Sequence, residues 1–240
     1  MIPVPTDASR RRGLGFIAGA AAGLGLARMA WAQATPEAQA DKLLDAVGGR
    51  AAWARVANLL SDSQQNSPDE PRIVRSLTAL DFRAPRMRTE TTAPGLHAVR
   101  VVDGERHWWY TRDGAVEPLP AAVLEHDRRA WAAHPLRTLQ RLAVRDPALT
   151  LKAGAAGRLE VHEGGRRLAW YALDARGEPY GWGAYGDEAG TLCGPWEAER
   201  RGIHHPLWTA SVDGRMRTLL KSVDVNIELG AGFFERPVRR

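Results

Sequence analysis

The sequence has a single cysteine, Cys193, among its 240 residues. One cysteine excludes an intramolecular disulfide, so we expect the fold to depend on its hydrophobic core even in an oxidising compartment. The formal net charge is +5, yet no cluster of Lys and Arg sits on a recognisable nucleic-acid-binding module. A nucleic-acid partner is therefore not expected.

Motifs for catalysis and metal binding are also missing. The sequence has no G-x-S-x-G and no H-E-x-x-H, and none of its 7 histidines has Cys/His metal-ligand spacing. Segment 181–186 fits G-x-G-x-x-G, but a dinucleotide fingerprint must follow a parallel strand and open a helix. Glu178-Pro179 precedes the segment and a turn signal follows it, so we expect a glycine-rich strand or turn. We expect no catalytic residue, no metal and no cofactor; an enzyme would need a His–carboxylate pair assembled in the fold.

Residues 1–34 predict a signal peptide. A basic stretch at 10–12 precedes a Gly/Ala-rich apolar run over 14–26, and small residues at 30–34 offer a cleavage site. The run is too short for a membrane-spanning helix. Its paired arginines resemble a twin-arginine leader, with Gly13 where Phe is usual. The twin-arginine route and the general secretory route both stay open.

The charge and the cysteine position bear on the mature protein. The leader holds four arginines and Asp7, and so +3 of the formal +5, which leaves +2 for residues 35–240. The basic character is thus partly a targeting feature. No cysteine stands directly after the cleavage site, where a lipid anchor would be attached, so we expect an exported, soluble periplasmic protein without a lipid anchor.

After the leader, helical spacing gives way to strand alternation. Thr35-Pro36 starts a predicted helix that Gly48-Gly49 ends, and a short second helix covers 50–56. Alternation broken by Pro, Asp and Gly then predicts strands, interrupted once by helices over 121–133 and 135–144. The predicted strands are 59–65, 72–82, 86–92, 97–102, 105–111, 149–152, 157–162, 166–173, 180–185, 191–199, 208–212 and 215–227, the last two forming a hairpin around Asp213-Gly214.

This order of elements predicts the fold class. No strand–helix alternation supports a parallel sheet, so we expect an antiparallel α+β fold. Residues 35–240 contain no repeat, linker or low-complexity tract. They are therefore expected to form a single domain of about the size that one hydrophobic core supports.

Motifs along the mature chain resemble the LolA/LolB-like outer-membrane lipoprotein carriers. They are the Gly48-Gly49 end of the first helix, the Asp103-Gly104 hairpin with Trp108 and Tyr110, and a closing series of Gly202-Ile203-His204-His205-Pro206, Asp213-Gly214, Val223-x-Val225-Asn226 and Phe234-x-x-Pro237. The resemblance implies an incomplete β-barrel of about eleven strands, strongly curved, with helices covering its concave face. In that family the cavity receives acyl chains of a lipoprotein or another amphiphile.

The aromatic side chains supply the candidate binding residues. The mature chain keeps eight Trp, which on strands of a curved sheet either complete the core or line an apolar cavity. The cavity reading follows from the resemblance, and its candidates are Leu80, Phe82, Trp108, Tyr110, Trp170, Trp196 and Trp208. The expected function is non-catalytic binding or transport of a lipid or an acylated lipoprotein, with 121–144 as a lid. The alternative is a sensor on the same fold that binds a membrane-anchored envelope protein.

Overall fold

The computed structural model describes residues 34–68, 70–111, 115–184, 186–199, 201–230 and 232–235. The predicted signal peptide therefore lies, except for its last residue, outside the described residues. The helices are α2 (Pro36–Ala46), α3 (Arg50–Ala54), α4 (Ala121–Ala132) and α5 (Pro135–Ala143), with a 3-10 turn, η2, at Ala155–Gly157. No helix among the described residues combines the length and apolar character needed to cross a membrane.

The described residues form fourteen strands, and all of them except β12 overlap a predicted strand. The first half of the chain forms β1 (Asn58–Ser67), β2 (Glu70–Asp81), β3 (Arg86–Ala93), β4 (Leu96–Asp103) and β5 (Arg106–Thr111). The second half forms β6 (Leu149–Ala153), β7 (Leu159–Glu163), β8 (Arg166–Leu173), β9 (Pro179–Ala184), β10 (Thr191–Cys193), β11 (Trp196–Ala198), β12 (His204–Pro206), β13 (Trp208–Ser211) and β14 (Arg217–Val225).

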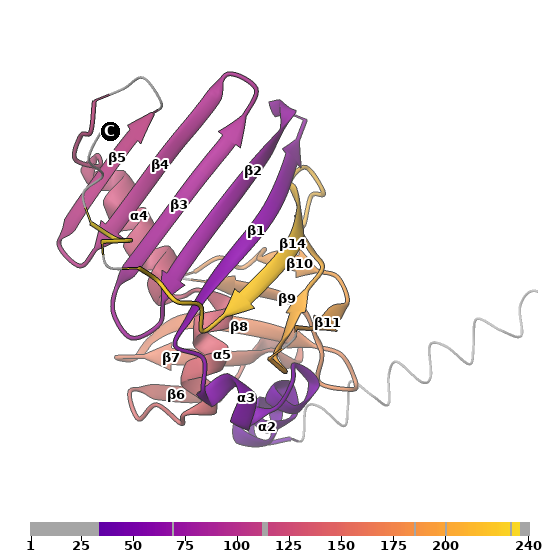
Figure 1. The fold of residues 1–240 in the computed structure, drawn as a ribbon. Helices are drawn as coiled ribbons and strands as arrows, with labels where there is room; N and C mark the ends of the chain where they lie inside the picture. The colour runs from indigo at the N-terminus through magenta and orange to yellow at the C-terminus, as the bar shows by residue number, and fades with distance from the viewer. Residues whose placement is uncertain are drawn as a thin grey trace, which may run out of the picture.

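Twelve of these strands form one sheet in the order β5-β4-β3-β2-β1-β14-β13-β10-β9-β8-β7-β6. Every pairing is antiparallel, and β14 joins the two halves by pairing with β1. Within the described residues the sheet is not closed, because its edge strands β5 and β6 each pair with one other strand; Trp109 of β5 also forms an isolated bridge with Glu117. Figure 1 shows β1–β5 running steeply while β6–β8 cross the lower part of the molecule. The predicted α+β fold with an open, curved antiparallel sheet is confirmed.

The strand expected over 191–199 is divided in two. Gly194-Pro195 interrupts it, and proline has no N–H to donate to a ladder. Thr191–Cys193 stays in the main sheet as β10, whereas Trp196–Ala198 leaves it and pairs with β12 in a separate two-stranded sheet. The predicted Asp213-Gly214 turn does connect β13 and β14, with Gly214 at φ +71°.

The main core lies on the sheet face that carries the helices, which we call the helix face. Thr35 caps α2 by accepting a hydrogen bond from the Ala38 N–H at 3.2 Å, and α2 buries Leu43 and Leu44. These residues join Trp53 of α3, the leucines of α5, and Leu59, Leu80 and Tyr171 of the sheet. Gly48 allows the chain to pass close to the Gly202 carbonyl, because a Cβ on it would lie 2.3 Å from that oxygen.

Toward the far ends of β1–β3 the same face becomes polar. Half-buried hydroxyl side chains lie next to one another across these strands. They are Ser61, Ser63, Ser76, Thr78, Thr89 and Thr91. Helix α4 lies over the neighbouring part of this face, and its one buried side chain among the described residues is Asp127. Burial raises the pKa of Asp127, and Arg100, 3.4 Å away, offsets this only in part. This part of the helix face is therefore not an apolar cavity.

The opposite face, which we call the tail face, has its own small core. Ala79, Val99 and Val101 pack there against Phe233 and Phe234 of the C-terminal segment. Figure 1 shows that segment crossing the sheet on the side away from α4. The predicted hairpin of β4 and β5 is confirmed, since its register places Trp108 opposite Val101 and Tyr110 opposite Val99 on this one face.

Candidate functional site

The structure distributes the predicted cavity residues over three places. Leu80, Phe82 and Trp196 are buried members of the main core. Trp108 and Tyr110 pack on the tail face against the smaller core. Trp170 and Trp208 lie over glycines in the second half of the sheet. These seven side chains do not surround one cavity, and their ligand role stays a prediction.

Trp170 packs against Gly183, the middle glycine of segment 181–186. A Cβ on Gly183 would lie 2.4 Å from the Trp170 ring, and a Cβ on Gly190 would also lie 2.4 Å from it. The indole N–H donates to the Asp187 carbonyl at 2.7 Å, and the Arg158 guanidinium lies 3.7 Å from the ring centroid. Gly183 and Gly190 make room for this aromatic ring, and residues 181–184 belong to β9, as a glycine-rich strand.

Trp196, Trp208 and Cys193 are held by similar local contacts. The Trp196 indole N–H and the Cys193 thiol both donate to the Pro179 carbonyl, at 2.8 and 2.9 Å. Burial raises the pKa of Cys193 to about 12, so this thiol stays protonated at neutral pH. Trp208 lies against Gly194, where a Cβ would meet the indole at 1.9 Å, and its outer side reaches solvent.

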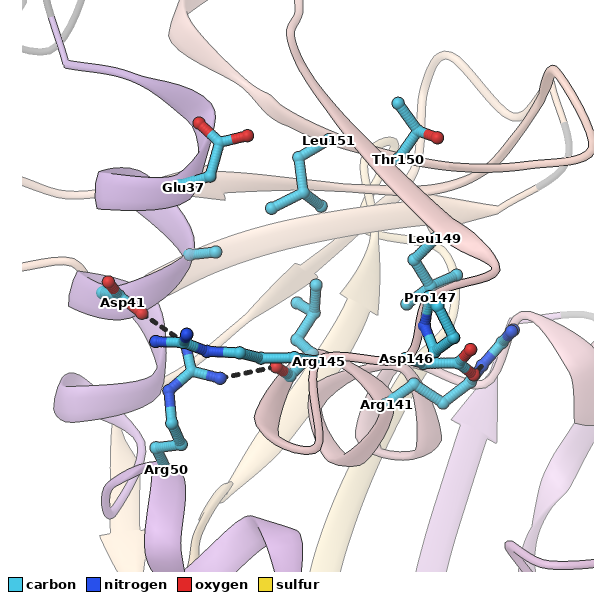
Figure 2. A pocket seen from close by; sticks show the side chains of 12 residues that line it. Glu37, Asp41, Arg50, Arg141, Arg145, Asp146, Pro147, Leu149, Thr150 and Leu151 are labelled. Carbon is cyan, nitrogen blue, oxygen red and sulfur yellow. Dashed lines mark hydrogen bonds and ion pairs between the residues drawn. The ribbon is translucent and has the colours of Figure 1, made fainter.

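A separate pocket of about 470 Å³ opens between α2, α3, α5 and β6 (Figure 2). Its apolar lining comes from Ala40, Leu142, Leu149 and Leu151. Its charged lining comes from Glu37, Asp41, Arg50, Arg141, Arg145 and Asp146. The volume lies within the range of about 300–1,000 Å³ that is usual for small-molecule sites. We call this space the α2–α5 pocket.

Arg50 is fixed in this pocket by the end of α5. Its Nη1 donates to the carbonyls of Leu142 at 2.7 Å and Ala143 at 3.0 Å. The last carbonyls of a helix lack the usual intrahelical partner, so the guanidinium satisfies the Ala143 carbonyl and adds a further donor to the Leu142 carbonyl, which also accepts from the Arg145 N–H. Its Nη2 pairs with Asp41 of α2. The Nε–H and one Nη2–H of this oriented guanidinium have no protein partner among the described residues.

Arg145 occupies a backbone position that normally selects glycine. It follows α5 at φ +54°, and the turn has the two bonds of a Schellman motif: Asp146 N to Arg141 O at 3.0 Å and Arg145 N to Leu142 O at 3.2 Å. The left-handed conformation costs a residue with a Cβ about 1–2 kcal/mol. Figure 2 shows the Arg145 side chain reaching from this turn toward α2 and the Arg50–Asp41 pair. Its guanidinium has no ion-pair partner in the described part of the chain.

Ion pairs of the buried Arg141 side chain hold the turn that carries Arg145. The Arg141 side chain donates from Nε to Asp146 at 2.7 Å and from Nη2 to Glu163 at 2.5 Å. Burial opposes its charge, but these carboxylates prevail and raise the pKa of Arg141. Burial likewise opposes ionisation of Asp146, whereas the Ala148 N–H and Arg141 lower its pKa overall. Both groups stay ionised at neutral pH, so the turn is anchored to β7.

The ion pairs leave one cation and one carboxylate of the lining without a charged partner among the described residues. Asp41 and Asp146 are each paired with an arginine. Arg145 and Glu37 have no charged partner among the described residues, and Glu37 sits in the first turn of α2, where a carboxylate favours the helix dipole. An oriented guanidinium can bind a carboxylate or phosphate with two parallel hydrogen bonds. The pocket thus combines an anion-binding group with an apolar surface.

Two His–carboxylate pairs occur elsewhere in the part of the chain that the structure describes. His97 Nε2 lies 3.1 Å from Glu90, and His162 Nε2 lies 2.9 Å from Glu160. The hydrogen bond from His162 is the main reason that the pKa of Glu160 is lowered. Neither histidine lines the α2–α5 pocket. Within the described residues, no three His, Cys, Asp or Glu side chains are grouped closely enough to hold a metal ion.

Sequence reasoning missed the residues of the α2–α5 pocket. Arg50 follows Gly49 at the start of a short helix, and nothing in that pattern shows that its side chain reaches α5. A signal did exist at Arg145: the helix 135–144 is followed by Pro147, yet no glycine stands at its C-terminal cap. An arginine where glycine is usual is a place to look for function.

Comparison with known proteins adds little to this geometry. No protein family model matches the chain, and no curated protein matches its sequence. Among solved structures, the chain is similar to a DUF1329 family protein from Desulfovibrio piger, with 8% sequence identity and a TM-score of 0.39. The match covers 84% of this chain and 98% of the other. A similarity this low supports no conclusion about function.

Proposed function

We propose that this protein is a non-catalytic binder of an amphiphile that has an anionic head group and an alkyl chain. The observation that supports the proposal is the composition of the α2–α5 pocket. The Arg145 guanidinium has no ion-pair partner among the described residues and lies beside an apolar surface made by Leu142, Leu149 and Leu151. An alkyl chain on these leucines leaves water at about 0.8 kcal/mol per CH₂, while the head group meets the guanidinium.

The site of this proposal differs from the cavity expected from the lipoprotein-carrier resemblance. On the helix face, one part is filled by the main core and another part carries Ser and Thr hydroxyls. The pocket lies instead at the rim, between the helices and edge strand β6. Together with the predicted signal peptide, this favours a periplasmic protein that takes up a free lipid-like anion or the acyl group of a lipoprotein.

Titration with saturated fatty acids tests the proposal. Laurate is expected to bind with one-to-one stoichiometry, and each CH₂ removed from the chain should weaken binding about fourfold, from ~0.8 kcal/mol per CH₂. Dodecyltrimethylammonium, with the same chain and the opposite charge, should bind much more weakly. Affinity that does not change between octanoate and laurate would contradict an apolar site.

Two leucine variants make the test specific to the pocket. Leu151→Ser removes apolar surface inside the pocket and should weaken laurate binding by about tenfold, because most of a leucine side chain is lost. Leu96→Ser is the matched control, since Leu96 is a half-buried strand leucine outside the lining. Equal affinities of the two variants would place the binding site elsewhere.

A further inference from the structure

Large apolar side chains are exposed together at one end of the tail face. Ile73, Leu192, Trp208 and Leu219 are 62, 39, 41 and 42% exposed. The register brings them to the same face: Trp208 pairs with Leu219, and Leu192 pairs with Ala210, two residues from Trp208. Leu219 also pairs with Gln64, whose other partner, Arg75, is two residues from Ile73. We call these four residues the apolar patch.

The patch continues into a hairpin tip and forms a shallow hollow. Val212 and Met216, in the turn between β13 and β14, are also exposed, at 53 and 46%. Ile73, Trp208 and Leu219 line a hollow of about 320 Å³ together with Arg217. Contiguous exposed apolar surface of this kind marks an interaction site on most proteins. None of these residues lines the α2–α5 pocket, so the two surfaces are independent.

Charge indicates which partner the apolar patch meets. Arg217, opposite Ala210 on the same face, has no ion-pair partner among the described residues. The nearby carboxylates are already engaged: Asp62 accepts hydrogen bonds from Arg75 at 2.7 and 3.0 Å, and Asp213 accepts from the Ser211 hydroxyl. The surface is therefore apolar and cationic. Trp side chains favour the boundary between lipid chains and head groups, and Arg side chains are drawn to anionic lipids.

We propose that the apolar patch is a docking surface for the interface of an anionic lipid bilayer. Trp208 and Leu219 insert at the level of the head groups, and Arg217 contacts lipid phosphates. The protein then lies on the membrane without spanning it. This goes beyond the proposed function and does not depend on it, because the surface binds the bilayer whether or not the α2–α5 pocket holds an amphiphile.

The test is co-sedimentation of the full chain with vesicles of phosphatidylcholine alone or with phosphatidylglycerol added. Binding is expected only with the anionic lipid and should fall steeply when salt rises, as screening requires. The double variant Ile73→Ser/Leu219→Ser should bind anionic vesicles at least about tenfold more weakly. Arg217→Gln should lower the affinity for anionic vesicles several-fold. Tyr180→Ser, at a residue 51% exposed outside the patch, is the matched control and should bind like the wild type.

Several results would overturn the proposal. Wild-type protein that stays in the supernatant with anionic vesicles would do so directly. So would a double variant that binds as well as the wild type. A dimer in solution that the double variant dissociates would assign the apolar patch to a second copy of the chain instead. A wild-type protein that binds vesicles but does not bind laurate would refute only the amphiphile site. The two proposals can therefore be refuted independently of each other.

Discussion

Replacing Arg145 with glycine should make the protein more stable and worse at binding. The left-handed backbone at Arg145 carries a cost of about 1–2 kcal/mol that glycine does not carry. Glycine in turn loses about 0.5–1 kcal/mol more conformational entropy on folding. The difference predicts that Arg145→Gly raises the free energy of unfolding by about 0.5–1 kcal/mol. No ion pair is lost, because Arg145 has none among the described residues.

The assay combines thermal unfolding with laurate titration. A gain of this size should raise Tm by about 1–4 °C in a domain of this length. The same variant should bind laurate at least about tenfold more weakly, because a charge-assisted hydrogen bond is worth about 1.5–3 kcal/mol. A fall in both stability and affinity would refute the reasoning, since it would show that the Arg145 side chain supports the fold.

Two controls separate the backbone effect from the charge effect. Arg145→Ala keeps a Cβ at the left-handed position, so it should weaken binding without raising Tm. Ala156 has φ +55° in an exposed turn outside the α2–α5 pocket. Ala156→Gly should therefore raise Tm and leave laurate affinity unchanged. We therefore expect both glycine variants to have a higher Tm, and only Arg145→Gly to bind laurate more weakly.

Three further predictions concern stability. Gly183→Ala should lower the free energy of unfolding in urea by about 2–3 kcal/mol, because its Cβ would lie 2.4 Å from the Trp170 ring and 2.6 Å from the Asp187 carbonyl. Gly230→Ala is the control and should leave that free energy unchanged, because a Cβ there meets open space. His134 has its pKa lowered to about 4, mainly by burial, so its contribution to stability is present above pH 6.5 and is lost as pH falls through 4. His134→Gln should remove that loss of stability. Burial raises the pKa of Asp127. The protonated carboxyl therefore favours the folded state below pH 3.8, and this stability is lost as pH rises through the folded-state pKa. Asp127→Asn avoids this loss, so its stability relative to the wild type should increase between about pH 4 and 7.

The strands and turns could be predicted because their signals are local. Alternating side chains and the Pro, Asp and Gly clusters between them give the antiparallel order without any tertiary information. The Thr35 cap and the Asp213-Gly214 turn are likewise local, and both are confirmed. The division of 191–199 was not foreseen, although Gly194-Pro195 stands inside it. A proline within a predicted strand favours a break at that position, because proline is confined to edge strands, strand starts and bulges.

The side-chain faces could not be predicted, because they depend on register. Alternation shows which residues of one strand share a face, but not which face that is relative to the next strand. Bulges at Asp62/Ser63, Val161/His162 and Ala172/Leu173 shift the alternation again within the sheet. Leu80 and Trp108 therefore seemed candidates for one cavity and lie on opposite faces. Their residue types indicate that these side chains are buried, but not on which face of the sheet they lie.

The most direct test of the account is native mass spectrometry of the full chain purified without detergent, followed by extraction of any bound lipid. The account predicts one anionic amphiphile with an alkyl chain per protein in the wild type and a largely empty Arg145→Ala variant. A wild-type protein that is empty and also fails to bind laurate in titration would contradict it.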